Sequence, residues 1–343
     1  MTVGTGLWLN TLRAYSWVRM PPPYLGLDLG GSGTRAALVG EDGRLLARGV
    51  GPTGLTGGGA AGRRHLARAL NATLAAIAQL VGDQSCSVFA GARGLSVPGR
   101  RESLMLELST RFPNADVHES NDAVIALWGA LAGREGVAVL SGSGSIALAR
   151  SDDGREGRAG GWGYLLGDEG SGYWLGREAL AAYLRALEGR EAAGALAELV
   201  ASEINTRSVP ETIAWLYAGD QQVVRVAALA PLVTQAAARG DLVAVSTMRR
   251  TGQALADLAA AAARQVWPAV LPEGLLVACC GGVWSAGDTL AAPFASALAE
   301  RLPGARCTLA ALSPVGGALL LAMGADQHPI APGVLENLRE ARL

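Results

Sequence analysis

The stretch GSGTRAALVGEDGR at residues 31–44 follows the apolar run YLGLDLG and has an echo further along the chain. Residues 142–155, GSGSIALARSDDGR, follow VAVLS and align with it without a gap at an offset of 111 residues, with half of the fourteen positions identical. In both copies a turn of glycine and hydroxyl residues leads into a strand-like segment, and an Asp-Gly-Arg turn follows. We infer a duplicated fold in which each half opens with the same β-hairpin.

The segments around the two copies indicate an α/β chain. In the first half we expect strands and helices at 24–30, 34–39, 45–50, 66–81, 87–95, 101–112, 115–120 and 123–133. The second half restarts at residue 136, becomes mainly helical over 168–265, and continues with a strand at 274–284, a helix at 285–301, a strand near 306–311 and a helix from Pro314. We therefore expect a disordered or non-native extension at 1–20, domains at 21–122 and 123–325, the second with a helical insertion, and a C-terminal helix at 326–343 that could return to the first domain.

The composition excludes several classes of protein. A net charge of −1 over 343 residues argues against nucleic acid and anionic membranes as partners. No apolar run has the length of a membrane span, and residues 1–20 lack the pattern of a signal peptide, so we expect a cytoplasmic protein. Lysine is absent and all 29 basic residues are arginine, which excludes a P-loop and a protein kinase because both need a lysine.

The four cysteines, Cys86, Cys279, Cys280 and Cys307, form no CxxC pair. Their spacings do not suit zinc or an iron–sulfur cluster. We interpret them as small buried hydrophobic residues in a reducing compartment.

The two glycine turns suit phosphate binding. Such a loop exposes several backbone N–H groups in one direction, and its hydroxyl groups add donors. A single turn of this kind would be an ordinary hairpin, but the pair favours two phosphate loops that hold a polyphosphate between them. The candidate residues are Gly30, Gly31, Ser32, Gly33 and Thr34 in the first loop and Ser141, Gly142, Ser143, Gly144 and Ser145 in the second.

Three further features bear on chemistry. Asp28 interrupts an apolar strand, so either a hydrated Mg²⁺ compensates its burial or it caps a turn. Asp122 follows Asn121 at a helix start, where it is either a general base for an attacking hydroxyl or an N-cap. The segment GGWGYLLGDEGSGYWLG at 160–176 suits a polyhydroxylated ligand, with a structural turn and helix cap as the alternative; its candidate residues are Gly161, Trp162, Asp168 and Glu169.

These motifs, together with GGVW at 281–284, resemble the N-acetylglucosamine kinase family over residues 24–325. That family is grouped with the benzoyl-CoA-reductase-type activator ATPases in the actin-like ATPase superfamily, which includes hexokinase. The resemblance implies two ribonuclease-H-like domains of α/β type with ATP in a cleft between them. It implies that Asp28 holds Mg²⁺ through water, that Gly281 and Gly282 flank adenosine, and that Asp122 takes the proton of the sugar 6-hydroxyl. It further implies that Asp168 and the backbone near Gly161 and Ser143 bind sugar hydroxyls, and that Asn121, Trp162 and Glu169 belong to the sugar site.

The resemblance has two departures. Gly54 and Ile146 occupy positions where members of the family carry asparagine, so glucosamine or N-acetylmuramic acid remains an alternative to N-acetylglucosamine. An activator ATPase is a second class, but it needs iron–sulfur cysteines near the phosphate loops, and the sequence places none there. A sugar-binding regulator would need a DNA-binding segment, and none precedes residue 24. We expect an amino-sugar kinase that uses Mg²⁺ and ATP, with a homodimer left open.

Overall fold

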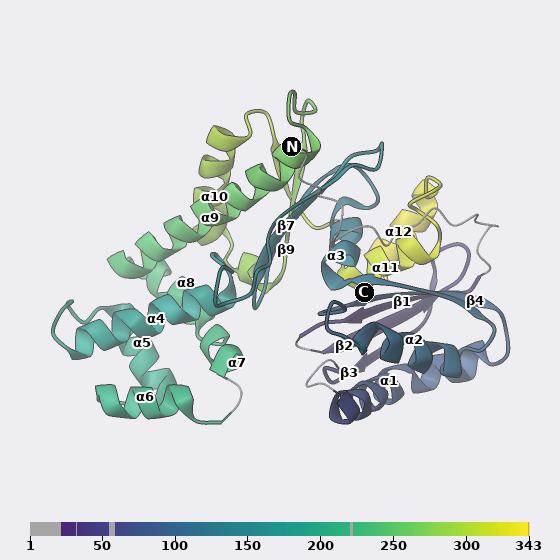
Figure 1. Ribbon diagram of the computed structural model, residues 1–343. Coiled ribbons are helices and arrows are strands. Elements are labelled where there is room, and N and C mark those ends of the chain that lie inside the picture. The colour runs from purple at the N-terminus through teal and green to yellow at the C-terminus, as the bar shows by residue number, and fades with distance from the viewer. Residues whose placement is uncertain (1–21, 32, 55–58, 220–221, 342) are drawn as a thin grey trace. The chain divides into compact units, whose positions relative to one another are not determined.

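A computed structural model describes residues 22–31, 33–54, 59–219, 222–341 and 343 (Figure 1). The expected N-terminal extension at 1–20 and Ser32 lie outside the described residues. The chain divides into two compact units, Met1–Glu135 with Ala310–Leu343, and Gly136–Leu309. We call them unit 1 and unit 2.

Unit 1 contains one five-stranded sheet with the strand order β3-β2-β1-β4-β5. Strand β1 pairs antiparallel with β2 and parallel with β4, and β4 pairs parallel with β5. The strands are β1 (Tyr24–Leu29), β2 (Thr34–Val39), β3 (Leu45–Gly51), β4 (Cys86–Ala92) and β5 (Ala115–Asn121). The helices are α1 (Gly59–Val81), α2 (Arg100–Arg111), α3 (Asp122–Leu131), α11 (Pro314–Ala322) and α12 (Pro332–Glu340).

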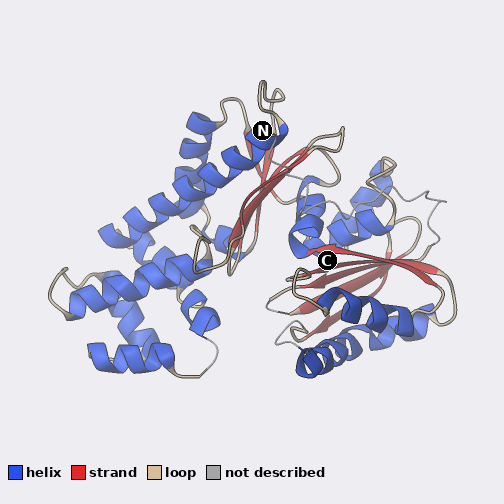
Figure 2. Cartoon of the chain, in the orientation of Figure 1, coloured by secondary structure: helices blue, strands red, loops and turns tan. Residues whose placement is uncertain are grey.

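Helices cover both faces of this sheet (Figure 2). Leu38 of β2 belongs to the apolar cluster that α1 and α2 complete. Its neighbours Ala37 and Val39 belong to a second cluster, which α3 and α11 complete. Because both faces are buried, β1 is apolar on both sides except at Asp28, as sheets covered by helices are.

Unit 2 repeats the same strand order, here β8-β7-β6-β9-β10 when read from the matching edge. Its strands are β6 (Gly136–Ser141), β7 (Ser145–Arg150), β8 (Glu156–Gly160), β9 (Leu276–Cys280) and β10 (Arg306–Leu309). The helices are α4 (Gly172–Leu187), α5 (Ala195–Ile204), α6 (Val209–Tyr217), α7 (Gln222–Ala227), α8 (Ala230–Ala238), α9 (Leu242–Val266) and α10 (Asp288–Arg301), with a short 3₁₀ helix η1 (Gly282–Ala286). Strand β8 is an element that the sequence analysis does not predict.

The two copies of the repeated sequence form the same hairpin. Strands β2 and β7 occupy matching positions, at the offset of 111 residues. In the first turn the N–H of Gly40 donates to Arg44 O, and in the second the N–H of Ser151 donates to Arg155 O, both at 3.0 Å. Gly43 and Gly154 both adopt a positive φ, of 79° and 84°. The matching sheets and turns confirm the duplicated α/β fold inferred from the sequence.

The unit boundaries differ from the expected domain boundaries. Residues 123–135 and 310–325 lie in unit 1, because α3 and α11 pack backbone to backbone there. A Cβ added to Gly317 would lie 1.9 Å from the carbonyl oxygen of Ile125, and one added to Gly129 would lie 2.3 Å from that of Ser313. Helix α12 also belongs to unit 1, where Asn337 Nδ2 donates to Asp42 O at 2.8 Å.

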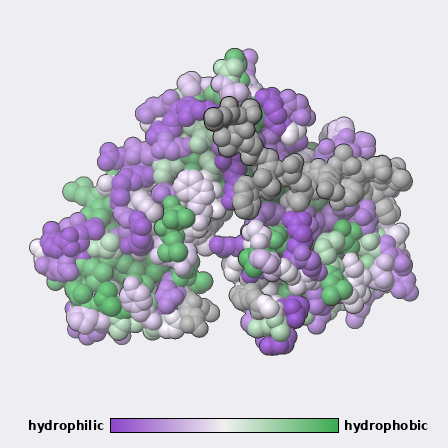
Figure 3. All heavy atoms as spheres, in the orientation of Figure 1, coloured by the Kyte–Doolittle hydropathy of each residue, from purple (hydrophilic) through white to green (hydrophobic). Residues whose placement is uncertain are grey.

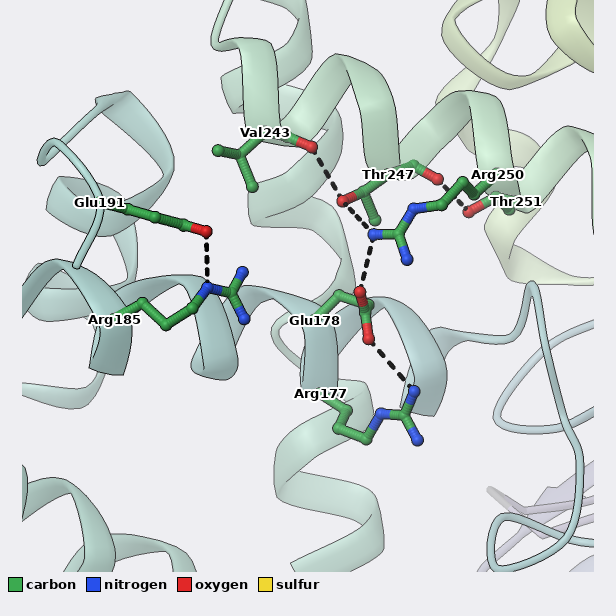
Figure 4. Close-up of polar contacts among 8 residues, drawn as sticks. All are labelled: Arg177, Glu178, Arg185, Glu191, Val243, Thr247, Arg250 and Thr251. Carbon is green, nitrogen blue, oxygen red and sulfur yellow. Dashed lines mark hydrogen bonds and ion pairs between the residues drawn. The ribbon is translucent and has the colours of Figure 1, made fainter.

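Polar contacts join α4 to the long helix α9 within unit 2 (Figure 4). Glu178 on α4 accepts from Arg177 at 3.1 Å and from Arg250 on α9 at 2.7 Å. The Arg250 guanidinium also lies 5.1 Å from the ring centroid of Trp174, a distance suited to a cation–π contact. Paired hydrogen bonds from Arg177 and Arg250 hold the pKa of the Glu178 carboxyl below its usual value despite its burial.

Apolar side chains also reach the surface over the helical part of unit 2 (Figure 3). Exposed large apolar residues there are Ile213, Tyr217, Val224, Leu242 and Val245. Within the described ranges, none of the helices combines the length and the apolar character needed to cross a membrane.

The duplicated turn allows a matched test of α12 docking. Gly154→Ala should cost about 1–2 kcal/mol, because its positive φ disfavours a side chain although no atom lies within 4 Å of the added Cβ. Gly43→Ala should cost more, because its Cβ would also lie 2.9 Å from the carbonyl oxygen of Val334 on α12. Denaturant unfolding of both variants measures the difference. Equal losses would show that α12 gives way at no cost.

Candidate functional site

The first glycine loop connects β1 to β2 in unit 1. Leu29 and Thr34 face each other across its base, and the N–H of Gly30 donates to Gly33 O at 3.0 Å. The segment after β3 anchors the loop, because Thr34 Oγ1 donates to Pro52 O at 2.9 Å and Thr53 Oγ1 donates to Gly30 O at 3.0 Å. A hydroxyl has one proton to donate, so Thr34 holds the loop in place instead of presenting the donor expected from the sequence.

The second loop connects β6 to β7 in unit 2 and is one residue shorter. Ser141 and Ser145 pair at its base, and the N–H of Gly142 donates to Gly144 O at 3.0 Å. Ser145 Oγ donates to Glu169 O at 2.7 Å, in the same way that Thr34 donates to Pro52. Ser141 Oγ donates to Gly170 O at 2.7 Å. In this loop too, the hydroxyls of Ser141 and Ser145 donate to backbone carbonyls instead of presenting the donors expected from the sequence.

The segment 160–176 fastens this second loop. Asp168 is buried with a φ of 64°, and its Oδ1 accepts the backbone N–H of Ser145 at 3.1 Å. The N–H of Gly161 donates to Ser145 O, and the N–H of Gly172 donates to Gly142 O. Asp168 and Gly161, expected to bind sugar, therefore have partners within unit 2. The segment combines this structural turn with a helix cap, because Ser171 Oγ accepts from Trp174 N at 3.1 Å.

The same segment also presents an exposed surface. Trp162 is 68% exposed, and Leu165 and Leu166 are exposed as well. The Tyr164 and Tyr173 rings lie 5.0 Å apart. Glu169 is exposed although its carbonyl accepts from Ser145. Of the four sugar-site candidates in this segment, Trp162 and Glu169 are thus the ones whose side chains face solvent.

Two carboxylates lie at the carboxyl ends of strands in unit 1. Asp28 on β1 is buried, and its Oδ2 lies 3.9 Å from Arg35 Nη1 on β2. Burial, reinforced by the charge of Asp122, raises the pKa of Asp28 to about 6, although Arg35 opposes the shift. The sheet order explains the proximity, since β1 and β5 flank β4 and run parallel to it.

Asp122 is the first residue of α3, but it is not the N-cap. That position belongs to Asn121, whose Oδ1 accepts the N–H of Ala123 at 3.0 Å. Asp122 Oδ1 also accepts this N–H at 3.0 Å. Burial raises the pKa of Asp122, while the charge of Arg93 and the Ala123 N–H lower it.

Arg93 is a site residue that the sequence analysis missed. It follows β4, and its N–H donates to Leu29 O at 3.1 Å, next to the first loop. A Cβ on Gly31 would lie 2.7 Å from Arg93 Nη1, so the guanidinium lies directly against that loop. Its place could have been inferred from the parallel order of β1, β4 and β5, which brings the end of β4 between the two carboxylates.

The turn after β9 lies against the second loop. A Cβ on Gly281 would lie 2.3 Å from Ser141 O, and its φ is 101°, so the position requires glycine. Gly282 has open space around it. Contrary to the expectation from the sequence, a cysteine does lie near this loop: Cys280 pairs with Leu140, the residue before Ser141.

Residues of unit 1 fit a hydrated magnesium ion. Among the described residues, no three His, Cys, Asp or Glu side chains gather as a direct metal cage. Asp28 and Asp122 are nevertheless two acidic groups close enough for the charge of one to raise the pKa of the other. Mg²⁺ keeps several waters and is commonly held by one or two carboxylates together with substrate phosphates.

Asp28→Asn should stabilise the ligand-free protein at pH 7.5 by up to about 3 kcal/mol, because one pKa unit corresponds to ~1.4 kcal/mol and the native pKa is about 6 against 3.8. At pH values between 3.8 and about 6 the folded state binds more protons than the unfolded state, so wild-type stability falls as pH rises through this range. The advantage of the variant should therefore disappear near pH 4. Denaturant unfolding at both pH values checks this, and an advantage independent of pH would contradict it.

The glycine pair after β9 gives a test of nucleotide approach. Gly282→Ala should leave stability within about 0.5 kcal/mol of wild type, because the added methyl meets no atom within 4 Å, but it should raise KM for ATP if adenosine lies on this backbone. Gly281→Ala should lower Tm, because its methyl would clash with the Ser141 carbonyl. Thermal melts and steady-state kinetics separate the two effects. An unchanged KM for Gly282→Ala would remove this turn from the nucleotide site.

Two units with one strand order, each with a glycine loop between its first two strands, define an actin-like ATPase fold. The chain belongs to the BadF/BadG/BcrA/BcrD ATPase family, whose profile matches residues 25–322. Membership of this family implies the use of ATP.

Three relatives add detail. An N-acetylmuramic acid/N-acetylglucosamine kinase of Clostridium acetobutylicum is 36% identical over 135 residues, which are 39% of this chain and less than half (44%) of that protein. An N-acetyl-D-glucosamine kinase of Dictyostelium discoideum is 29% identical over 68% of this chain and 77% of its own length. The crystal structure of a proposed N-acetylglucosamine kinase of Chromobacterium violaceum is 31% identical, with a TM-score of 0.68, and the match covers 87% of this chain and 98% of that one.

Proposed function

We propose that this protein is an ATP-dependent amino-sugar kinase that phosphorylates the 6-hydroxyl of N-acetylglucosamine. The observation that carries the proposal is the group formed by Asp28, Asp122 and Arg93 beside the first glycine loop. Phosphoryl transfer needs positioned charges and a base for the attacking hydroxyl, and these residues supply both. The names of the three relatives support the sugar class.

Asp122 is the proposed base. Its carboxylate takes the proton of the sugar hydroxyl while the hydroxyl oxygen forms a bond to the γ-phosphorus, and ADP leaves. Arg93, whose charge opposes the rise in the pKa of Asp122, favours the ionised form of that carboxyl and offers positive charge to the phosphoryl group. Mg²⁺ carried by the nucleotide would be held through water by Asp28 and would neutralise phosphate charge.

The two loops have complementary roles in the proposal. Backbone N–H groups at Gly31 and Gly33 receive the terminal phosphates, and those of residues 143 and 144 receive phosphate from unit 2. The N–H groups of Gly30 and Gly142 are already bonded within their own loops. Thr34 and Ser145 donate their hydroxyl protons to carbonyls, and these bonds anchor the end of each loop before nucleotide arrives. Fixed N–H groups need no reorganisation on binding, which favours electrostatic stabilisation of the transferred group.

The proposed sugar site uses fewer residues of the segment 160–176 than the sequence predicts. Trp162 offers an exposed aromatic face, and Glu169 an exposed carboxylate, to a sugar. Gly54 has no amide side chain to contact a sugar. It packs against α1, where an added Cβ would lie 2.9 Å from the Cβ of Ala69. N-acetylmuramic acid, named for the Clostridium relative, and glucosamine are therefore the alternative substrates.

A coupled ADP-release assay over a panel of sugars tests the proposal. N-acetylglucosamine, N-acetylmuramic acid, glucosamine and glucose are compared at equal concentrations with Mg²⁺ and ATP. The highest kcat/KM should belong to N-acetylglucosamine, and mass spectrometry should find the product phosphorylated at the 6-position. ATP hydrolysis that no sugar stimulates would contradict a kinase and favour an activator-type ATPase.

Asp122→Asn should fold and bind ATP as the wild type does, while kcat falls at least ~10²-fold, because the amide keeps the shape but cannot accept the proton. Stability should rise at neutral pH, since a carboxyl whose pKa is raised by burial loses its charge. Asp288→Asn is the matched control, because Asp288 is also the first residue of a helix, α10, but is exposed. Near-wild-type kcat in Asp122→Asn would refute the assignment.

A further inference from the structure

Two of the four cysteines lie side by side at the edge of the sheet in unit 2. Cys279 is on β9 and Cys307 is on β10, and their sulfur atoms are 3.3 Å apart. The strands run parallel, with Cys307 opposite Val277, so Cys279 is two residues further along and on the same face of the sheet. The sequence separation of 28 residues gave no sign of this pair.

The two thiols differ in access to solvent. Strand β10 is an edge strand, and Cys307 is exposed. Cys279 is buried with 4% exposure, and Cys280, the next residue, extends to the opposite face of β9. A reagent in water therefore meets Cys307 first and reaches Cys279 through it. This differs from the expectation that all four cysteines are buried hydrophobic residues.

Its exposure at the edge strand makes Cys307 the nucleophile of the pair. Cys279 stabilises the thiolate of its neighbour, and this contact lowers the pKa of Cys307 despite partial burial. Burial raises the pKa of Cys86 to about 11 and that of Cys280 to about 12, so these two thiols stay protonated at neutral pH. An exposed thiolate beside a second thiol is the arrangement in which oxidation proceeds to a disulfide.

We propose that Cys279 and Cys307 form a reversible disulfide, which makes this sheet edge a site of thiol oxidation by small disulfides. The Cys307 thiolate attacks one sulfur of oxidised glutathione, forms a mixed disulfide and releases one glutathione. The Cys279 thiol then loses its proton and attacks the Cys307 sulfur, which releases the second glutathione. Two protein thiols are oxidised by two electrons, and one glutathione disulfide is reduced to two thiols. The sulfur atoms must approach by about 1.2 Å to reach a bond of about 2.05 Å. Because the two residues are diagonal in the register, strands β9 and β10 must also shift toward each other as the bond forms.

The bond would act next to the second glycine loop. Strand β9 runs directly into Gly281, which lies against the Ser141 carbonyl. A covalent link from β9 to β10 would therefore fix the strand that positions this turn. The inference goes beyond the proposed function, and its test does not depend on kinase activity.

The test counts free thiols in the full-length protein before and after incubation with excess oxidised glutathione. Wild type should go from four thiols to two without a bound glutathione, and peptide mapping should link Cys279 to Cys307. Dithiothreitol should restore four. Cys280→Ser, the matched control, should lose two thiols as well. Cys279→Ser should retain one glutathione on Cys307, and Cys307→Ser should lose none.

Three results would overturn the proposal. Wild type that keeps all four thiols would show that the pair does not react. A stable glutathione adduct on wild-type Cys307 would show that Cys279 does not resolve it. A disulfide that includes Cys280 would show that the thiols rearrange in a way the sheet does not predict.

Discussion

The burial of two carboxylates close together in unit 1 is the constraint on which the candidate site depends. Asp28 and Asp122 oppose each other's ionisation, and an apolar environment disfavours the charge of both. Sheet and helices hold them there, since apolar clusters on both faces fix β1, β4 and α3. Arg35 and Arg93 offset only part of the cost, because both pKa values remain raised. We propose that a positively charged ligand or metal completes this site.

Both duplicated halves contain the glycine loop, but the acidic residues beside it differ between them. In unit 1 the residue before Leu29 is Asp28, whereas the matching position in unit 2, before Ser141, is Leu140. The second loop instead receives the carboxylate of Asp168 from the segment after β8, as an acceptor for a backbone N–H. Asp28 and Asp122 in unit 1 therefore bring two negative charges close together. Asp168 in unit 2 instead holds a loop through a hydrogen bond. We propose that this asymmetry reflects a division of roles, with the chemistry in unit 1 and ligand binding in unit 2.

The sequence allowed prediction of the features that depend on neighbouring residues. The repeated Gly-x-Gly and Asp-Gly-Arg turns, the buried strands and the helix beginning at Asp122 all have local signals. Features that depend on distant partners could not be predicted in this way. Thr34 donates its hydroxyl proton to the carbonyl of Pro52. Helix α3 packs against α11 so closely that a Cβ added to Gly317 would lie 1.9 Å from the carbonyl oxygen of Ile125. Neither pairing leaves a pattern in the residues around it. The roles of the site residues themselves stay predictions.

The helix cap bears directly on how Asp122 is interpreted. A carboxylate at a helix start is ordinarily explained by capping, which stabilises the first turn by about 1 kcal/mol. Here Asn121 already provides that bond from the N-cap position, and Asp122 adds a second acceptor to the same N–H of Ala123. The added acceptor brings little stability, whereas burial of the carboxyl beside Asp28 costs free energy, as its raised pKa indicates. Local stability thus does not account for an aspartate at this position. The proposed role of Asp122 as a base, close to Arg93 and beside the first glycine loop, accounts for it.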